Sequence, residues 1–186
     1  MRRAVYGLAG LAALSAACGP ATVRPASYAD PDVACPAGRS AWTLAIKDER
    51  AEPKGSEKML AAIRDGIQKS FPGCRWADAG AGADTITIEV HRFVSRLDDE
   101  NTSWEAAVEW TVRAQNAGGR TLTEFQADEV LARPNYRGSD NEKESLTEAY
   151  QKALARTIKG LQALPATMSR QLAPESPTGS PQQEGS

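Results

Sequence analysis

Three cysteines, Cys18, Cys35 and Cys74, carry the side chains with the clearest chemistry in this 186-residue sequence. A cysteine can accept a lipid as a thioether, bridge to a second cysteine or bind a metal ion. The sequence contains no CxxC and only one histidine, His91, so scattered Cys and His ligands are not expected to form a zinc site. We therefore expect covalent roles for the cysteines, and neither a metal nor a cofactor.

Residues 1–17 have the three parts of a secretory signal peptide, which is removed from the mature protein. Arg2 and Arg3 form the charged start, and an apolar run follows from Ala4 to Leu14. This run is about half of the roughly 20 residues that a transmembrane helix needs. Cleavage is therefore expected rather than permanent insertion.

The end of this signal resembles the lipobox of bacterial lipoproteins. Ala16 and Ala17 fit its small positions, Leu14 supplies the aliphatic residue one place early, and Ser15 departs from the usual leucine before Cys18. The resemblance implies that Cys18 is lipidated, with acyl chains of the palmitate type as the membrane anchor. The alternative is ordinary cleavage that leaves Cys18 as a thiol.

The compartment follows from the same resemblance. In lipoproteins of Gram-negative bacteria, an aspartate after the lipidated cysteine retains the protein at the inner membrane, whereas this sequence has Gly19. The resemblance thus implies a lipid-anchored protein on the periplasmic face of the outer membrane. In that oxidising space Cys35 and Cys74 are expected to form a disulfide, with two buried thiols as the alternative.

Composition divides the mature chain into three parts. Residues 18–40 contain four prolines and few aliphatic residues, which predicts an extended tether; residues 167–186 predict a disordered tail. Residues 41–166 are expected to fold as one domain. Loss of Arg2 and Arg3 reduces the 22 basic residues to 20 against 24 acidic ones, a net charge near −4 that argues against nucleic acid as a partner.

Hydrophobic periodicity predicts the elements of that domain. Alternating residues indicate strands at about 41–47, 83–97, 104–114 and 121–131, while a spacing of three and four indicates helices at about 56–71 and 139–163. The expected helix stripes are Leu60, Ile63, Ile67 and Phe71, then Leu146, Tyr150, Ala153, Ile158 and Leu161. The order predicts an α+β two-layer sandwich (β-α-β-β-β-α), in which a four-stranded, mostly antiparallel sheet has two helices on one face.

Three local signals refine this arrangement. The apolar residues of the second strand change parity near His91, which predicts a β-bulge there. Residues 116–119 (Asn-Ala-Gly-Gly) predict a hairpin turn, and Ser139 with Glu142 has the spacing of a capping box that opens the last helix.

This layout is similar to a group of periplasmic lipoproteins that includes the YajG-like family, the lipoprotein subunit of the lipopolysaccharide-assembly translocon, and the auxiliary lipoproteins of envelope lipid transporters. The hairpin and the charged segment from Arg133 to Tyr150 are its most suggestive part. The resemblance implies an accessory or docking subunit without catalysis, working on an envelope protein partner. A lipid- or glycolipid-binding module is the alternative.

Other polar residues have plainer interpretations than catalysis. The sequence contains no GxSxG motif of a serine hydrolase, so His91 is expected to be a partly exposed sheet residue. The acidic turn 98–101 lacks the spacing of an EF-hand loop, so it is expected to be a solvated turn rather than a calcium site. Lys152, Arg156 and Lys159 share a helix face that could meet lipid phosphates or an acidic partner, or could simply be solvated. We expect the partner to contact an edge strand or the hairpin at residues 116–120.

Overall fold

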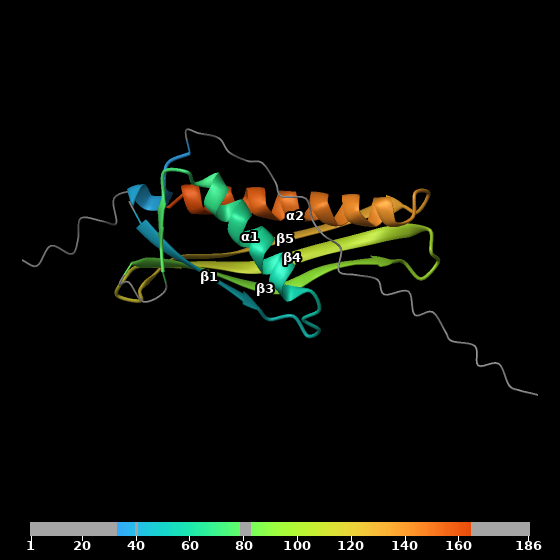
Figure 1. Ribbon diagram of the computed structural model, residues 1–186, viewed down its shortest axis with the longest axis horizontal. Helices are drawn as coiled ribbons and strands as arrows, with labels where there is room; N and C mark the ends of the chain where they lie inside the picture. The colour runs from blue at the N-terminus through green and yellow to red at the C-terminus, as the bar shows by residue number, and fades with distance from the viewer. Residues whose placement is uncertain (1–32, 40, 79–82, 165–186) are drawn as a thin grey trace, which may run out of the picture.

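The computed structural model of the chain describes residues 33–39, 41–78 and 83–164, which form a sheet covered on one face by two helices (Figure 1). The elements are the 3₁₀-helix η1 (Pro36–Gly38), strands β1 (Ala41–Asp48), β2 (Arg75–Ala77), β3 (Asp84–Leu97), β4 (Ser103–Gln115) and β5 (Thr121–Pro134), and helices α1 (Ser56–Ser70) and α2 (Ser139–Gln162). The predicted α+β sandwich is confirmed.

The sheet has five strands rather than the predicted four, in the order β2-β1-β3-β4-β5. Strand β1 pairs in parallel with both β2 and β3, while β3, β4 and β5 form antiparallel ladders. Sequence periodicity missed β2 because its three residues are too short to display an alternation.

The predicted bulge lies where the parity changes. The register of β3 against β4 shifts between Val90 and Arg92, so one residue, His91, is inserted into β3. The shift places Phe93 on the same side as Val90, where both are buried in the core.

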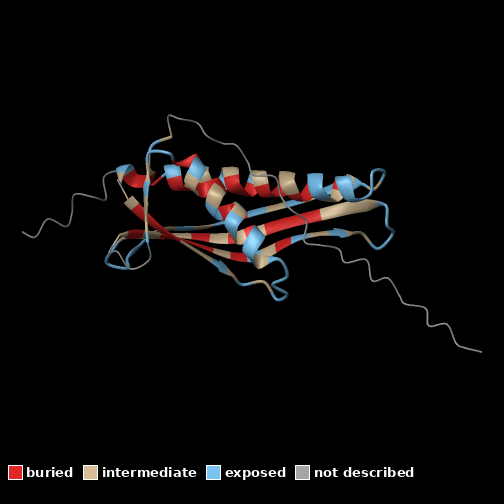
Figure 2. Cartoon of the chain, in the orientation of Figure 1, coloured by how far each residue is buried: buried red, intermediate tan, exposed pale blue. Residues whose placement is uncertain are grey.

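The core lies between the helices and one face of the sheet, where buried residues line the facing surfaces (Figure 2). Its centre is aromatic: the ring of Tyr150 meets Trp110 and Phe93 edge-on, with centroids 6.3 and 6.2 Å apart. The Trp110 indole donates a hydrogen bond of 2.8 Å to the hydroxyl of Thr157, which satisfies a polar atom inside the core.

The buried helix stripes differ in part from those expected. In α1, Met59 is buried where Leu60 was expected, and Leu60 is only partly buried. In α2, Thr157 is buried while Ile158 is partly exposed, because the Thr157 hydroxyl bonds to Trp110 and to the Ala153 carbonyl. A hydropathy stripe could not anticipate a buried threonine that has two hydrogen-bond partners.

The predicted capping box at the start of α2 is wrong. Ser139 is already the first helical residue, and the N-cap is Gly138, whose φ of 57° and ψ of −128° are accessible to glycine but strained for other residues. No side chain caps this helix; the Asn141 and Glu142 amides instead donate to the Gly138 carbonyl. The expected hairpin turn is present, with Gly119 at a φ of 78°.

An ion pair joins the end of β1 to the start of α1. Arg50 donates from Nε and Nη2 to the two carboxylate oxygens of Asp48 at 2.7 and 2.8 Å, and Ser56 donates to the same carboxylate. A further Arg50 nitrogen lies 3.4 Å from the Phe93 carbonyl of β3. The hydrogen bonds from Arg50 hold the pKa of Asp48 well below its usual value.

Replacing Asp48 by Asn should lower the free energy of unfolding by about 2 kcal/mol at neutral pH, because Arg50 loses a charged partner. The folded-state pKa of Asp48 is depressed, so its contribution is complete above the unfolded value of 3.8 and disappears as the pH falls toward the folded value. Urea denaturation of both proteins at pH 7 and below pH 3.8 measures this. A difference that stays constant over this range would contradict the assignment.

Candidate functional site

The sheet face opposite the helices is open and carries cross-strand ion pairs. Lys47 pairs with Glu89 at 3.0 Å, Arg113 with Glu124 at 2.7 Å and Arg96 with Glu105 at 3.3 Å. The side chain of His91 is exposed and lies 2.9 Å from the hydroxyl of Thr111 on β4. Each strand thus supplies charges to its neighbour, which suits a surface in contact with water.

One apolar row interrupts these charges. Val94 of β3, Ala107 of β4 and Val130 of β5 are in register, and Val94 and Val130 are 37% and 58% exposed. A shallow depression of about 260 Å³ lies beside this row, lined by Arg92, Ala107, Val108, Glu109, Gln126, Asp128 and Val130. We call Val94, Ala107 and Val130 the apolar row.

The turn between β3 and β4 is held by its own side chains. Asp98 accepts hydrogen bonds of 2.7 Å from both the amide and the hydroxyl of Thr102, and one of 2.8 Å from the Ser103 hydroxyl. These hydrogen bonds, of which the one from the Thr102 side chain has the largest effect, lower the pKa of Asp98 to about 2. Asp98 therefore serves to shape the turn, and no group of metal-binding side chains is found in the part of the chain that the structure describes.

Asn135 joins this turn to the loop before α2. Its side-chain oxygen accepts from the Trp104 indole at 2.9 Å, and its side-chain nitrogen donates to the Asn101 carbonyl at 3.2 Å. The next residue, Tyr136, is 74% exposed, and the Arg137 guanidinium lies 6.0 Å from its ring centre. We call the two loops, residues 98–102 and 135–138, the far end.

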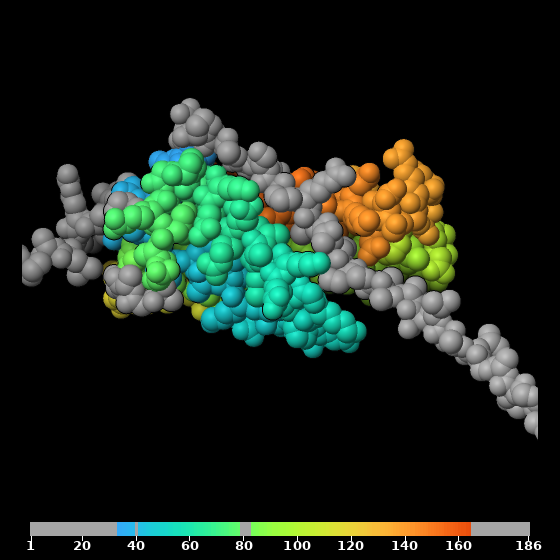
Figure 3. All heavy atoms as spheres, viewed as in Figure 1, coloured from blue at the N-terminus to red at the C-terminus, as the bar shows by residue number. Residues whose placement is uncertain are grey.

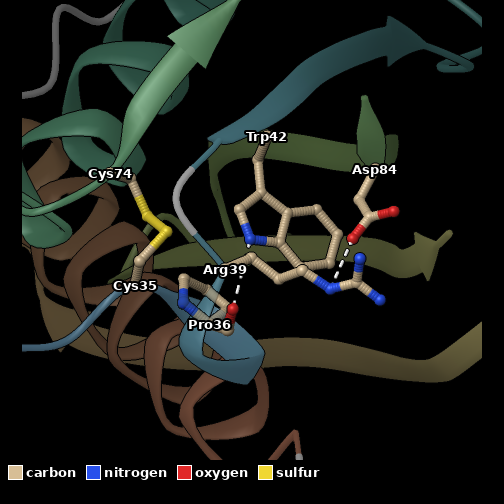
Figure 4. The surroundings of a disulfide bond; sticks show 6 residues. All are labelled: Cys35, Pro36, Arg39, Trp42, Cys74 and Asp84. Atoms are coloured by element: carbon tan, nitrogen blue, oxygen red, sulfur yellow. Dashed lines mark hydrogen bonds and ion pairs between the residues drawn. A yellow bond between two sulfur atoms is a disulfide. The ribbon is translucent and has the colours of Figure 1, made fainter. Parts of the chain in front are cut away.

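The opposite end of the domain is closed by a disulfide between Cys35 and Cys74, whose Cα atoms are 5.0 Å apart (Figure 4). Beside it, the Trp42 indole donates to the Pro36 carbonyl at 3.2 Å, and Arg39 forms a 2.7 Å ion pair with the buried Asp84. Residues 33–39, which the sequence assigned to the tether, therefore pack against the domain.

Both ends of the described chain lie at this disulfide end. The described residues begin at Val33 beside Cys35, and the end of α2 packs near η1 (Figure 1). Helix α2 has 24 residues, so the far end lies about 36 Å away along its axis. Figure 3 shows β3, β4 and the start of α2 extending beyond α1 toward that end.

The residues singled out from the sequence have different surroundings. Lys152 pairs with Glu148 at 3.0 Å, and Arg156 pairs with Glu129 at 2.8 Å, so neighbouring carboxylates balance both charges. Lys159 is exposed on the same helix. A lipid or partner contact through these three residues stays a prediction, and Cys18 lies outside the described residues.

No helix within the described ranges is long and apolar enough to span a membrane. No known family model matches the chain, and neither does any curated protein. Solved structures with some similarity include a lipoprotein from Neisseria meningitidis, at 13% identity over 66% of this chain and 99% of that chain, with a TM-score of 0.46.

Two others are a minor lipoprotein from Acinetobacter baumannii and the rare lipoprotein B from Shewanella oneidensis. Both are 11% identical, with TM-scores of 0.41 and 0.38; they match 68% and 63% of this chain, and 94% and 95% of their own. TM-scores below 0.5 do not support an inference about function, so the function of this chain has to be inferred from its own residues.

Proposed function

We propose that the chain is a non-catalytic lipoprotein, held at the periplasmic face of the outer membrane through Cys18, that docks a protein of a cell-envelope assembly. A lipid or lipopolysaccharide transport system is the kind of assembly that its layout suggests. One observation carries this proposal. The large apolar side chains that are exposed among the described residues, Val94, Val130 and Tyr136, all lie toward the far end.

Exposed apolar side chains beside charged ones favour protein contacts. Tyrosine and arginine are enriched among the residues that dominate binding energy, and Tyr136 and Arg137 are presented together by a hydrogen-bonded loop. The disulfide fixes the point at which the anchored segment enters the domain. A membrane anchor at one end and contact residues near the other would direct those residues away from the bilayer.

A lipid- or glycolipid-binding role is supported less well. The depression beside the apolar row contains one arginine, Arg92, but also the carboxylates of Glu109 and Asp128. Two carboxylates would repel the phosphate of a lipid headgroup at the distances such a depression allows. The same groups are compatible with the polar rim of a protein interface.

Replacing Cys18 by Ser should transfer the protein from the outer-membrane fraction to a soluble or unprocessed form, because the acyl anchor is lost. Fractionation with immunodetection measures this shift. The matched control replaces Cys35 and Cys74 by Ser, which removes the disulfide but leaves the anchor, and should stay in the membrane fraction. Retention of the Cys18→Ser variant in the outer membrane would contradict the proposed anchoring.

A further inference from the structure

Strand β3 extends beyond its neighbour β1. The parallel pairing of β1 with β3 ends at Asp48 and Val90, whereas β3 continues to Leu97 and remains paired with β4 on its other side. Within the described ranges, no strand pairs with the outer side of β3 from Phe93 to Leu97. Figure 1 shows β1 diverging from β3 in this region. We call Phe93–Leu97 the vacant edge.

The hydrogen bonds indicate which backbone groups this edge offers. The Asp98 amide donates to the Ser103 carbonyl at 2.9 Å, so this pair is a bonded one. Because bonded and non-bonded pairs alternate in an antiparallel ladder, Phe93, Ser95 and Leu97 direct their amides and carbonyls away from β4. The Arg50 guanidinium, 3.4 Å from the Phe93 carbonyl, agrees with this orientation.

Ser95 lies at the middle of the vacant edge. Its hydroxyl oxygen is buried and has no hydrogen-bond partner among the described residues. Ser95 pairs with the buried Ala106, so its side chain lies on the helix-covered face, and it is the backbone of Ser95 that faces the edge.

The other edges of the sheet are less open. At β5, the Arg156 guanidinium donates to the Asp128 carbonyl at 2.7 Å near the middle of that edge, whereas the 3.4 Å contact of Arg50 with the Phe93 carbonyl lies at the beginning of the vacant edge. At the opposite side, β2 has only three residues. The hairpin turn at residues 116–120, the other contact expected from the sequence, lies at the disulfide end, where the Ala117 amide bonds to Asp84.

Side chains along the vacant edge, together with Arg92 directly before it, specify the chemistry of a complementary strand. On the open face, β3 presents Arg92, Val94 and Arg96 in alternation, a basic, apolar, basic pattern. Both arginines approach the same carboxylate, that of Glu105, at 3.6 and 3.3 Å. Residues directly opposite in paired strands interact, so acidic residues would suit the two arginines and an aliphatic residue would suit Val94.

We propose that the vacant edge receives an extended segment of a protein partner, added as a strand in line with β1. This segment carries two acidic residues that flank an aliphatic residue in alternation, facing Arg92, Val94 and Arg96. The inference rests on the proposed docking function and names the edge and the partner segment that this function would use.

Fluorescence anisotropy of the full mature chain in detergent, with blocked peptides as probes, tests this proposal. One peptide has the sequence Thr-Glu-Thr-Val-Thr-Glu-Thr, and its control has lysine in place of both glutamates. The glutamate peptide should bind at least about ten-fold more tightly. Ser95→Pro, which removes an amide that faces the edge and spares the ladder to β4, should reduce this binding by a similar factor.

A second variant tests the charges without disturbing the backbone. Arg92→Glu combined with Arg96→Glu should reverse the preference in favour of the lysine peptide. Equal binding of both peptides to the wild type, or binding that Ser95→Pro leaves unchanged, would overturn the inference. If crosslinking from Val130 and Tyr136 still identifies an envelope partner, the docking function stands and only the vacant edge is excluded; if that fails as well, the proposed function itself is excluded.

Discussion

Replacing Cys35 and Cys74 by Ser should lower the free energy of unfolding by about 4 kcal/mol, the loss expected from chain entropy for a bridge across 39 residues. The bond closes the segment that contains η1, β1 and α1. This is a large fraction of the roughly 5–15 kcal/mol that stabilises an ordinary domain.

Urea denaturation without reductant measures this effect, with reduced wild-type protein for comparison. Either single variant should lose as much as the double one, because each removes the whole bridge. Cys18→Ser, which lies outside the described residues and leaves the Cys35–Cys74 bridge intact, is the matched control and should leave the midpoint unchanged. Equal stability of the double variant and the oxidised wild type would show that the bridge does not constrain the unfolded chain.

Replacing Gly66 by Ala should destabilise the domain by about 2 kcal/mol, although glycine to alanine in an open helix gains up to about 1 kcal/mol. A Cβ on Gly66 would lie 2.5 Å from the Tyr150 hydroxyl and 2.9 Å from a methyl of Leu154, where α1 crosses α2. Tyr150 is fully buried and its hydroxyl donates to the Ala62 carbonyl at 2.8 Å, so it has little freedom to move.

Thermal and urea unfolding measure this change, and Gly73→Ala supplies the control. A Cβ at Gly73 meets nothing within 4 Å, so that variant should stay close to wild type. A second variant, Gly160→Ala, should behave like Gly66→Ala, since its Cβ would overlap the ring of Phe125. A stabilised Gly66→Ala protein would mean that the two helices do not approach as closely as the structure shows.

The sequence predicted most of the sheet because its signals are periodic. Strand β4 alternates buried and half-buried residues from Val108 to Gln115, and the parity change at His91 located the bulge of β3. Strand β2 and the Gly138 cap were not predicted from the sequence, because each depends on contacts that no local pattern encodes. A three-residue strand forms only where β1 is available to pair with it.

The candidate docking residues were harder to predict for a related reason. Val94 and Val130 have the parity of the open face, yet only the register across β3, β4 and β5 shows that they flank Ala107. Exposure of Tyr136 depends on the bonds of Asn135 to Trp104 and Asn101. Such features arise from tertiary pairing, whereas the chemistry of Cys18 follows from the residues beside it.

Site-specific photo-crosslinking in the native envelope tests the central claim most directly. A photoreactive residue would replace Val130 or Tyr136 toward the far end, with the exposed Arg120 near the disulfide end as the matched control position. The account predicts that both far positions capture the same envelope protein, identified by mass spectrometry, and that position 120 does not. Capture of that protein equally from position 120, or no defined product from either far position, would contradict it.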